Sequence, residues 1–398
     1  MPGKRKDNKG RLLRTGESQR KDLTYMYRYT DMRGKRQCVY ADDLNKLREK
    51  EKKIQLDTLQ GLDISGGGIT VIELVERYVS LRRNVRYNTT VGYHFVLNVL
   101  RKEDFGYQQV SKVRVVDAKR FLLNLYDKGR GYSSINSIKG VLKPAFQMAV
   151  NDDYLRKNPF DFRMDLIPNN SQKRVAMTEE EQERYLEYVR NDEHFSRYYD
   201  EIIVLLGTGM RISELCGLTI ADLDFDRRRI RVDHQLVRTQ DGKRYIEKTK
   251  TECGCRYIPM SDEVYESFYN ILSNRKKQKK EVMIDGYAGF ILLDKNGNPK
   301  VAMHVQKVVQ RLCEKYNEEN IIPLPRITPH VFRHTFCTNM ANAGMDLKSL
   351  QYLMGHSDAS VTLNVYTHNS YEKAEESMAQ IVAFSGGQTK QENLRRFG

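Results

Sequence analysis

The sequence predicts a multidomain protein of the α+β class. We expect a small β-sheet-plus-helix module, then a helical bundle, then a larger, mainly α segment with a small antiparallel β-sheet. Three observations support this division. The chain has 398 residues, which suits two or three domains at about 100 to 200 residues each. Its hydrophobic period changes from two residues to three or four along the chain. Irregular stretches separate the segments.

The first segment, residues 1–60, has the pattern of a minimal sheet with one helix. Residues 23–30 alternate aromatic and polar side chains, a turn follows, and residues 35–40 resume the extended pattern. This arrangement predicts a hairpin. Residues 11–14 are interpreted as a third strand, and residues 43–54 as a charged helix that carries leucines on one side.

The second segment, residues 67–165, follows a glycine-rich break at residues 61–68. Its apolar side chains recur at spacings of three and four residues, which is the period of helices with one buried face. Four helices in fewer than 100 residues make a small bundle. They are expected near residues 71–79, 93–100, 117–125 and 133–150.

The third segment, residues 174–398, mixes helices and strands. It is preceded by an irregular stretch, and Thr178 to Glu181 has the form of a capping box at the start of a helix. Helices are expected around residues 199–206, from about Arg211 and after Val301. Three strands are expected around residues 230–233, 245–248 and 256–260, the first two joined through Asp241 and Gly242.

The charge balance indicates a polyanionic partner. Lys plus Arg number 67 against 52 Asp plus Glu, which gives a net charge of +15. Twelve basic and four acidic residues fall within the first 41 positions. A ribbon of strands rich in Arg and Lys can enter the major groove of DNA. The alternative is a solvated edge hairpin with incidental charge.

Candidate DNA-contacting residues follow from this reading, and double-stranded DNA is the predicted partner. Bases also lie on the polar faces of the bundle helices, among them Lys139, although such faces are often merely solvated. The candidates are Arg14, Tyr25, Tyr27, Arg28, Lys35 and Arg36 in the first segment and Arg82, Arg83 and Arg86 in the second.

Several other classes of protein and site are disfavoured. No run approaches the ~18 apolar residues of a membrane span, and the basic N-terminus lacks the apolar core of a signal peptide. We therefore expect a cytoplasmic protein without a membrane partner. The six cysteines are scattered, which fits reduced thiols. No metal site is expected, because Cys253-Gly-Cys255 is too short for a zinc ribbon, and His330 and His334 lack the metalloprotease glutamate.

A constellation of polar residues lies near the C-terminus. Thr328 and Pro329 read as the N-cap and first position of a helix, so His330 and Arg333 lie in adjacent turns on one face. A second helix then ends at a glycine that leaves His356 in a tight turn. The helices are bounded by Gly344, Asp346 and Gly355, and a short third helix starting at Ser357 or Asp358 carries Tyr366.

These residue types suit attack on a phosphodiester. Arginine is always ionised and bonds two oxygens at once, so Arg211 and Arg333 can grip the non-bridging oxygens without a metal. A phenol such as Tyr366 can form a covalent intermediate that keeps the ester energy. Lys250 is a suitable proton donor for the leaving 5′-oxygen. Glu214 is interpreted as a structural partner of Arg211.

The motifs resemble those of tyrosine recombinases of the phage-integrase family. The likeness is carried by Gly209-Met-Arg-Ile-Ser-Glu-Leu around Arg211, by His330-x-x-Arg333, by Leu353-Met-Gly-His356 and by Tyr366, with Lys250 at the place of the hairpin lysine. Arg11-Leu-Leu-Arg-Thr-Gly and Tyr25-Met-Tyr-Arg-Tyr are similar to sequences in integrases of conjugative transposons. The resemblance extends over residues from about 67 to 385.

The resemblance implies a mechanism and an assembly. Tyr366 would form a 3′-phosphotyrosyl link, Lys250 would protonate the leaving oxygen, His330 would assist, and two arginines with His356 would stabilise the transition state. Strand exchange would pass through a Holliday junction in a homotetramer, with no cofactor. The first segment would bind arm-type repeats, while the other two clamp the core site. An accessory excisionase or DNA-bending protein would set the direction, in the bacterial cytoplasm at the nucleoid.

The tail after Tyr366 predicts an amphipathic helix. Apolar residues recur at near-helical spacing between residues 371 and 384, from Ala374 to Phe384. We expect this helix to pack on a neighbouring protomer and so to hold the tetramer together. Packing on its own domain is the alternative.

Two other functions stay open at this stage. A DNA-binding regulator with a relic active site would explain the basic first segment, but it has no need of six intact site residues. An enzyme like a type IB topoisomerase would share the tyrosine chemistry, but it has no need of a site-reading arm.

Overall fold

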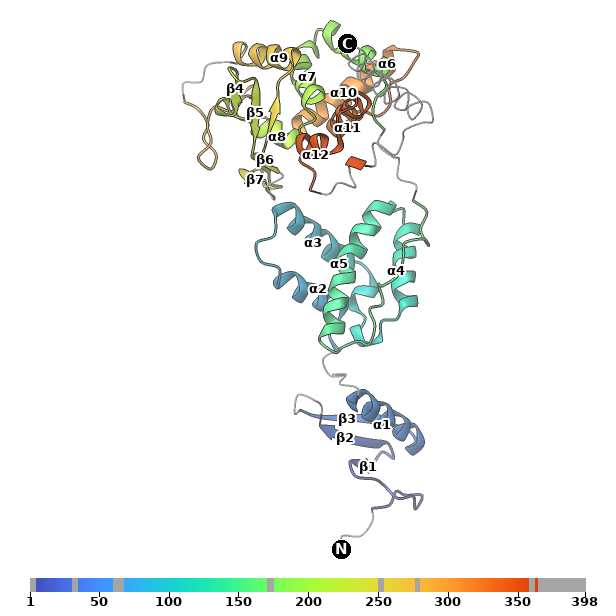
Figure 1. Cartoon of the computed structure of the whole chain (residues 1–398). Helices are drawn as coiled ribbons and strands as arrows, with labels where there is room; N and C mark the ends of the chain where they lie inside the picture. Colours follow the sequence, from blue (N-terminus) through green and yellow to red (C-terminus); the bar gives the residue numbers. More distant parts are fainter. Residues whose placement is uncertain are drawn as a thin grey trace, which may run out of the picture. The chain divides into compact units, whose positions relative to one another are not determined.

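The computed structural model describes residues 5–30, 35–59, 68–169, 175–249, 254–275, 280–357 and 362–363. The chain divides into two compact units, residues 1–172 and 173–398 (Figure 1). The first unit holds the N-terminal sheet and the four-helix bundle, and the second holds the remaining helices and two small sheets. Among the described helices, none has both the length and the apolar character needed to cross a membrane.

The N-terminal sheet contains the predicted hairpin. Strands β2 (Tyr25–Thr30) and β3 (Arg36–Ala41) pair antiparallel, with Arg28 opposite Cys38. The third strand was wrongly placed at residues 11–14, because β1 is Glu17–Gln19 and pairs with β2. The 11–14 backbone pairs instead with residues 5–7, in an antiparallel bridge between Lys6 and Leu12, and side chains add to it. Asp7 accepts a hydrogen bond from the Arg11 N–H, and Arg48 donates to the Leu12 carbonyl.

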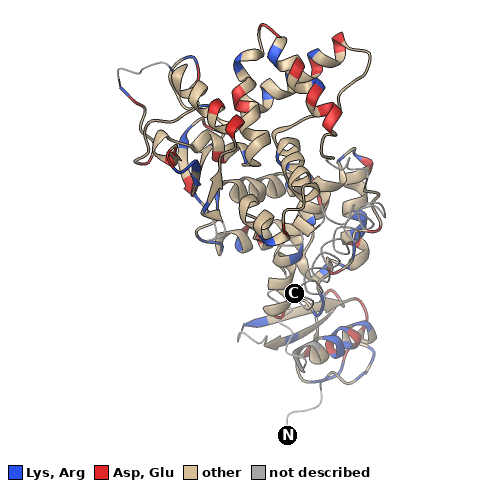
Figure 2. Cartoon of the chain, turned by 45° about the horizontal axis from the view of Figure 1, so that its top comes forward, with Lys and Arg blue, Asp and Glu red and all other residues tan. Residues whose placement is uncertain are grey.

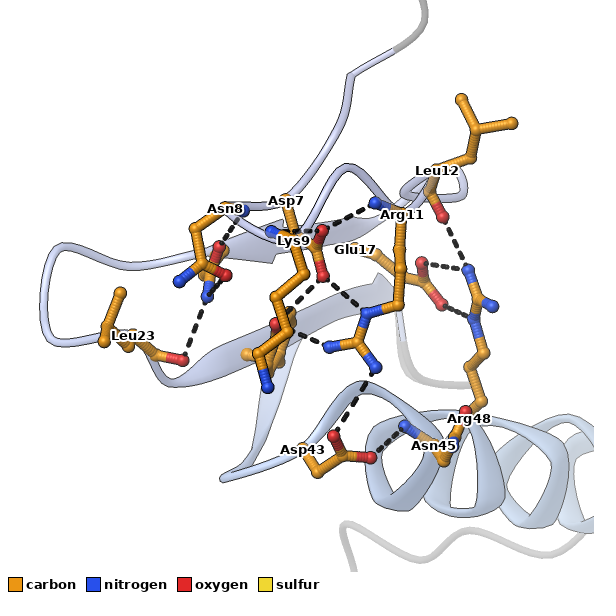
Figure 3. A network of polar contacts seen from close by, with 12 residues as sticks. Asp7, Asn8, Lys9, Arg11, Leu12, Glu17, Leu23, Asp43, Asn45 and Arg48 are labelled. Carbon is orange, nitrogen blue, oxygen red and sulfur yellow. Dashed lines mark hydrogen bonds and ion pairs between the residues drawn. The ribbon is translucent and has the colours of Figure 1, made fainter.

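Helix α1 (Leu44–Leu59) covers one face of this sheet, where Leu44 and Leu47 are fully buried against Tyr25 and Ala41. Such a small apolar core is supplemented by two buried carboxylates (Figure 3). Asp7 accepts from Arg11 Nε at 2.8 Å and from the Tyr25 hydroxyl at 2.9 Å. Glu17 accepts from Arg48 Nε at 2.9 Å. The two carboxylates tie the N-terminal segment to the sheet and to α1.

The bundle has its four predicted α-helices. Its core combines aliphatic side chains with an aromatic group, in which Phe146 and Phe160 are fully buried with their ring centroids 5.1 Å apart. Two 3-10 turns, Asp104–Tyr107 and Val110–Lys112, connect the middle helices. The helices are α2 (Val71–Ser80), α3 (Tyr87–Leu100), α4 (Val115–Asp127) and α5 (Tyr132–Asn151).

Helices dominate the second unit. The predicted capping box is present, with the Thr178 hydroxyl accepting from the Glu181 N–H. The core packs around Tyr185, Phe268, Phe290 and Phe332, all less than 2% exposed. The helices are α6 (Glu179–Asn191), α7 (Tyr199–Thr208), α8 (Ile212–Gly217), α9 (Asp262–Ser273), α10 (Ala302–Glu319), α11 (Pro329–Asn342) and α12 (Leu347–Met354).

The strands of this unit pair differently from the prediction. Strand β5 (Arg229–Val232) lies between β4 (Leu223–Asp224) and β8 (Arg256–Pro259). A separate hairpin joins β6 (His234–Arg238) to β7 (Arg244–Lys248). The sequence prediction missed β6 and wrongly joined 230–233 to 245–248. Only Asp233 separates β5 from β6, so the extended pattern shows no break where the chain changes sheets.

Candidate active site

Three helix ends converge on the site. Gly209 closes α7 in a left-handed conformation with φ +60°, and Arg211 is the N-cap of α8. A Cβ at position 209 would lie 2.4 Å from Cδ1 of Phe336 in α11, so only glycine fits there. Gly355, with φ +60°, ends α12 just before His356. The predicted helix boundaries at Pro329, Gly344 and Asp346 are confirmed.

The end of α12 is held by arginines from three different elements. Arg211 donates to the Gly355 carbonyl at 3.2 Å, and Arg333 donates to the Met354 carbonyl. Arg333 also donates to the Gly209 carbonyl at 2.7 Å. Arg256, the first residue of β8, donates to the Leu353 carbonyl at 2.6 Å. The structure therefore brings Arg211 and Arg333 together beside His356, although they lie far apart in the sequence.

Glu214 is the carboxylate of this cluster. It accepts from the Arg211 guanidinium at 2.8 Å and from the Arg211 N–H at 2.9 Å, as expected of a structural partner. Its other guanidinium partner is Arg256, at 2.8 Å. Burial alone would raise the pKa of Glu214, but the hydrogen bonds and charges of Arg256 and Arg211 outweigh burial and lower it to about 2.

Positive charge exceeds negative charge here. In the described part of the chain, the cluster combines the guanidinium groups of Arg211, Arg256 and Arg333 with the one carboxylate of Glu214. Burial, with the nearby Arg211, lowers the pKa of Arg333 to about 9. Burial and the charges of Arg333 and Arg211 lower the pKa of His356 to about 4. Such a cluster is ready to receive an anion.

His356 is held as a neutral side chain at the edge of this cluster. Its Nδ1 lies 2.9 Å from the Thr362 hydroxyl, and its backbone N–H donates to the Gln351 carbonyl at 3.2 Å. The Gln351 side chain donates in return to the His356 carbonyl at 3.0 Å. The turn after α12 is thus fixed from both sides, and the imidazole can offer its Nε2 to a bound group.

The structure describes only some of the other predicted site residues. His330 lies in the first turn of α11, three residues before Arg333, and is exposed. Lys248 ends β7 with an exposed side chain. Lys250 and Tyr366 lie outside the described residues, as does the expected helix of residues 371–384.

The β6–β7 hairpin that leads to Lys250 is anchored to the site. The ring of His234 is 1% exposed at the start of β6. Its Nε2 lies 2.8 Å from the carbonyl of Gly217, the last residue of α8, and its Nδ1 lies 2.5 Å from the Asp233 carboxylate. Asp222, Asp233 and His234 are close enough to suggest a metal site. Asp222 and His234, however, already have protein partners, since Thr219 and Arg231 donate to Asp222.

The candidate DNA-contacting residues of the N-terminal sheet divide between its two faces. Arg28 and Arg36 are exposed on the face opposite α1. Tyr25 and Tyr27 pack on the α1 side, and Tyr25 is 3% exposed with its hydroxyl bonded to Asp7. Burial therefore argues against a direct DNA contact by Tyr25. Arg14 and Lys35 are exposed. Basic and acidic residues are mixed along α1 (Figure 2).

Sequence reasoning missed Tyr40 on the open face of this sheet. Its side chain is 47% exposed, on the same face as Arg28, and the Arg20 guanidinium lies 5.5 Å from its ring centroid. The two-residue alternation of β3 could have indicated it.

The bundle candidates gather where α2 passes to α3. Arg82 and Arg83 are exposed, and Arg86 is the N-cap of α3. Arg82 donates to the Tyr78 hydroxyl at 2.9 Å and lies 4.8 Å from the centre of its ring. The expectation that Lys139 lies on a polar face was wrong. Lys139 is buried and donates to the Phe162 carbonyl.

Comparisons with known proteins agree with this geometry. Residues 176–373 match the phage integrase family, and residues 1–58 match the DNA binding domain of tn916 integrase. The transposase from transposon Tn1545 of Streptococcus pneumoniae is 42% identical over 96% of this chain and 97% of its own length. The transposase from transposon Tn916 of Enterococcus faecalis is 41% identical over the same shares, 96% and 97%.

A solved structure matches as well. It is a variant of the Tn1549 transposon integrase in complex with a circular intermediate DNA, 42% identical, with a TM-score of 0.75. The match covers 79% of this chain and 99% of that chain. The expected fold class and family are thus confirmed. The chain belongs to the phage integrase family and is a site-specific tyrosine recombinase of the kind that conjugative transposons encode.

Proposed function

We propose that Tyr366 is the nucleophile with which this recombinase cuts and rejoins DNA at the ends of its mobile element. The observation that carries the proposal is the convergence of Arg211, Arg333 and His356 around an excess of positive charge. A scissile phosphate would supply the missing negative charge.

In the cleavage step, the phenol oxygen of Tyr366 bonds to phosphorus and the bond to the 5′-oxygen breaks. A 3′-phosphotyrosyl ester forms, and the leaving oxygen takes a proton from Lys250 to become a 5′-hydroxyl. The 5′-hydroxyl of the partner strand then attacks the ester and restores the tyrosine. Energy is conserved in the ester, so the reaction needs no nucleotide.

The arginines would change partners as the phosphate enters. Their guanidinium groups now bond the Gly355, Met354 and Gly209 carbonyls. In the complex, Arg211 and Arg333 would turn N–H groups to the non-bridging oxygens, where charge develops in the transition state. Neutral His356 would donate from Nε2 to the same phosphate. His330, at the exposed start of α11, would orient the phosphate or relay a proton.

The three segments would divide the DNA among them. We assign arm-type repeats to residues 1–60 and the core site to residues 67–165 together with residues 174–398. The similarity of residues 1–58 to the DNA binding domain of tn916 integrase supports the first assignment. Exposed Arg28 and Arg36 on the open face of the sheet, and Arg82 and Arg83 at the bundle loop, support the surfaces involved.

The assembly would be a homotetramer on two core sites, held by exchange of the helix of residues 371–384, with a Holliday junction between the two rounds of strand exchange. An accessory excisionase or DNA-bending protein would set the direction of reaction. The element's DNA in the bacterial cytoplasm would be the substrate.

Covalent trapping tests the proposal. A core-site duplex with a nick just 3′ of the scissile phosphate loses the short 5′-hydroxyl fragment after cleavage, so the adduct accumulates. In EDTA, the unmodified chain should form a denaturation-resistant adduct and Tyr366→Phe should form none. Equal adduct from both proteins would show that the nucleophile is another residue.

The same assay separates the two alternative functions. A regulator with a relic active site would bind the duplex without forming an adduct. A topoisomerase-like enzyme would relax supercoiled DNA that lacks a core site as fast as DNA that contains one, whereas a recombinase should prefer its own site.

A further inference from the structure

Arg256 lies at the centre of the arginine cluster but outside the residues assigned to the chemistry. Its side chain is fully buried, whereas that of Arg211 is 35% exposed. Its Nε donates to the Leu353 carbonyl at 2.6 Å, and its guanidinium donates to both oxygens of Glu214, at 2.8 and 3.3 Å. A group so enclosed and so fully bonded in the structure is not available to DNA.

The three arginines bond three consecutive carbonyls. Arg256 takes Leu353, Arg333 takes Met354 and Arg211 takes Gly355. These are the last carbonyls of α12, which the helix itself leaves without partners and which carry its partial negative charge. Cations are therefore favourable there. His356 follows directly, so whatever holds these carbonyls also fixes the imidazole.

Two of the three bonds would be given up during catalysis. When Arg211 and Arg333 turn toward a phosphate, the Gly355 and Met354 carbonyls lose donors, while Arg256 keeps its hold on Leu353. Arg256 also controls the pairing of Glu214, which lies between Arg211 and Arg256. Without Arg256, Glu214 would pair with Arg211 alone and neutralise a charge that the phosphate needs.

Arg256 also bonds the backbone on the C-terminal side of Lys250. Its Nη1 donates to the Gly254 carbonyl at 3.3 Å. Gly254 packs so closely on Thr249, at the end of β7, that a Cβ there would lie 2.5 Å from the Thr249 Cβ. The last described residues on either side of the lysine are thus joined next to Arg256.

We infer that Arg256 is a positioning residue for strand cleavage: it shares Glu214 with Arg211 and holds the end of α12 while the catalytic arginines engage the phosphate. The inference rests on the proposed function. It goes further by naming a group that acts without touching the DNA.

The test must separate positioning from stability, since removing one partner of a buried ion pair also destabilises a protein. Arg256→Gln and Arg256→Lys in the full chain are compared with Arg275→Gln. Arg275 is the matched control, because it is 10% exposed in the same unit and likewise bridges a carboxylate, Glu281, and a carbonyl, Phe290. The core-site binding of each variant is measured first. Each variant is then assayed at a temperature below the midpoint of its thermal unfolding.

Single-turnover cleavage of the nicked duplex is the first readout. Arg256→Gln should bind the core site normally but cleave it roughly tenfold to hundredfold more slowly, somewhat less than loss of a direct donor would cost. Arg256→Lys keeps the charge but cannot hold Glu214 and Leu353 together. It should therefore cleave more slowly than the unmodified chain and faster than Arg256→Gln. Arg275→Gln should cleave within about twofold of the unmodified chain, because the partners that it loses, Glu281 and Phe290, do not belong to the arginine cluster.

A methylphosphonate at the scissile position is the second readout. Replacing one non-bridging oxygen by methyl removes the phosphate's negative charge, so the reaction depends less on aligned arginines. The defect of Arg256→Gln relative to the unmodified chain should shrink severalfold on this substrate. A merely structural role predicts the same defect on both substrates.

Two results would overturn the inference: normal cleavage of the phosphodiester by Arg256→Gln, or an equal defect on both substrates. Should Arg256→Gln fail to fold, Arg256→Lys is judged by the same two readouts. The proposed function fails separately, when Tyr366→Phe still forms the adduct. If Tyr366→Phe is inactive while Arg256→Gln cleaves at the normal rate, only the positioning role of Arg256 is refuted.

Discussion

At the scale of single residues, the cluster is defined by a shortage of negative charge. Three guanidinium groups lie around the carboxylate of Glu214, which pairs with only two of them, those of Arg211 and Arg256. The consequence is seen at His356, whose pKa is lowered to about 4 by burial and by Arg333 and Arg211. The imidazole is therefore a neutral donor at neutral pH. A neutral donor can bond a phosphate oxygen without adding charge to an already positive site.

The stability of the fold depends on pH through His356. The folded state disfavours protonated His356, so the unfolded chain binds its proton more readily. The stability that depends on a neutral His356 is fully present above the ordinary pKa of 6.5. It is lost as the pH falls from 6.5 toward 4. Core-site DNA should raise the pKa of His356 again, because a phosphate supplies the missing negative charge.

NMR of histidine-labelled protein measures this directly, with His356→Gln identifying the resonance among eight histidines. The free chain should titrate near pH 4 at this ring, and the complex of Tyr366→Phe with a core site should titrate higher. An unchanged or lower pKa in the complex would mean that no phosphate lies beside His356.

Much of the site could be predicted from residue types and spacing. Arg211, Arg333 and His356 lie near helix boundaries. Nearby Pro, Asp and Gly residues predict these boundaries from the sequence. Arg256 could not be predicted, because a single arginine before Tyr-Ile-Pro carries no motif. Its importance depends on a strand that brings it beside Glu214, 42 residues earlier in the chain.

At the scale of elements, the site depends on how closely α7 and α11 approach. Gly209 permits this contact, since its left-handed conformation ends α7 and its missing side chain leaves room for Phe336. Its carbonyl also accepts from Arg333. Gly209 therefore ends a helix, allows two helices to pack and helps to position Arg333, the donor proposed for catalysis.

Gly209→Ala tests this element. The methyl group adds strain at φ +60° and overlaps Phe336, so unfolding should become easier by roughly 2 to 4 kcal/mol. Gly344→Ala is the control, because Gly344 also has a positive φ, +86°, but no atom within 4 Å of the added Cβ. It should cost only the backbone term, about 1 kcal/mol. Denaturant unfolding followed by circular dichroism compares them, and equal losses would refute the packing argument.

Strands were predicted less well than helices for a physical reason. The two-residue alternation in residues 23–40 located β2 and β3, but it could not say which face α1 covers. Tyr25 was therefore proposed as a DNA contact, although it is a core residue. Likewise, β5 and β6 follow each other almost without a break, and only tertiary pairing separates them.

At the scale of the whole molecule, composition and hydrophobic period predicted three segments, and the two family matches fall on the first and third of these. More than half of the net charge of +15 lies within the first 41 residues, which hold twelve basic and four acidic residues. Binding that relies on many phosphate contacts releases counterions, so its affinity falls steeply with salt.

We expect core-site affinity to fall by roughly a thousandfold or more between 50 and 200 mM salt. Replacing both Arg82 and Arg83 by Gln should reduce the slope of log affinity against log salt by about two. Lys128→Gln is a suitable control in the same bundle, because Lys128 is engaged with Glu103 at 2.7 Å. A flat salt response, or an equal effect of the control, would contradict the assignment of the bundle loop to DNA.

Locating the covalent bond tests the role of Tyr366 most directly. The adduct trapped on nicked core-site DNA is digested with nuclease and protease, and the peptide that retains a nucleotide is sequenced by mass spectrometry. We expect a single modified peptide, with the nucleotide on the phenol oxygen of Tyr366 through a 3′-phosphate. A nucleotide attached to any other residue, or an unmodified peptide around Tyr366, would contradict it.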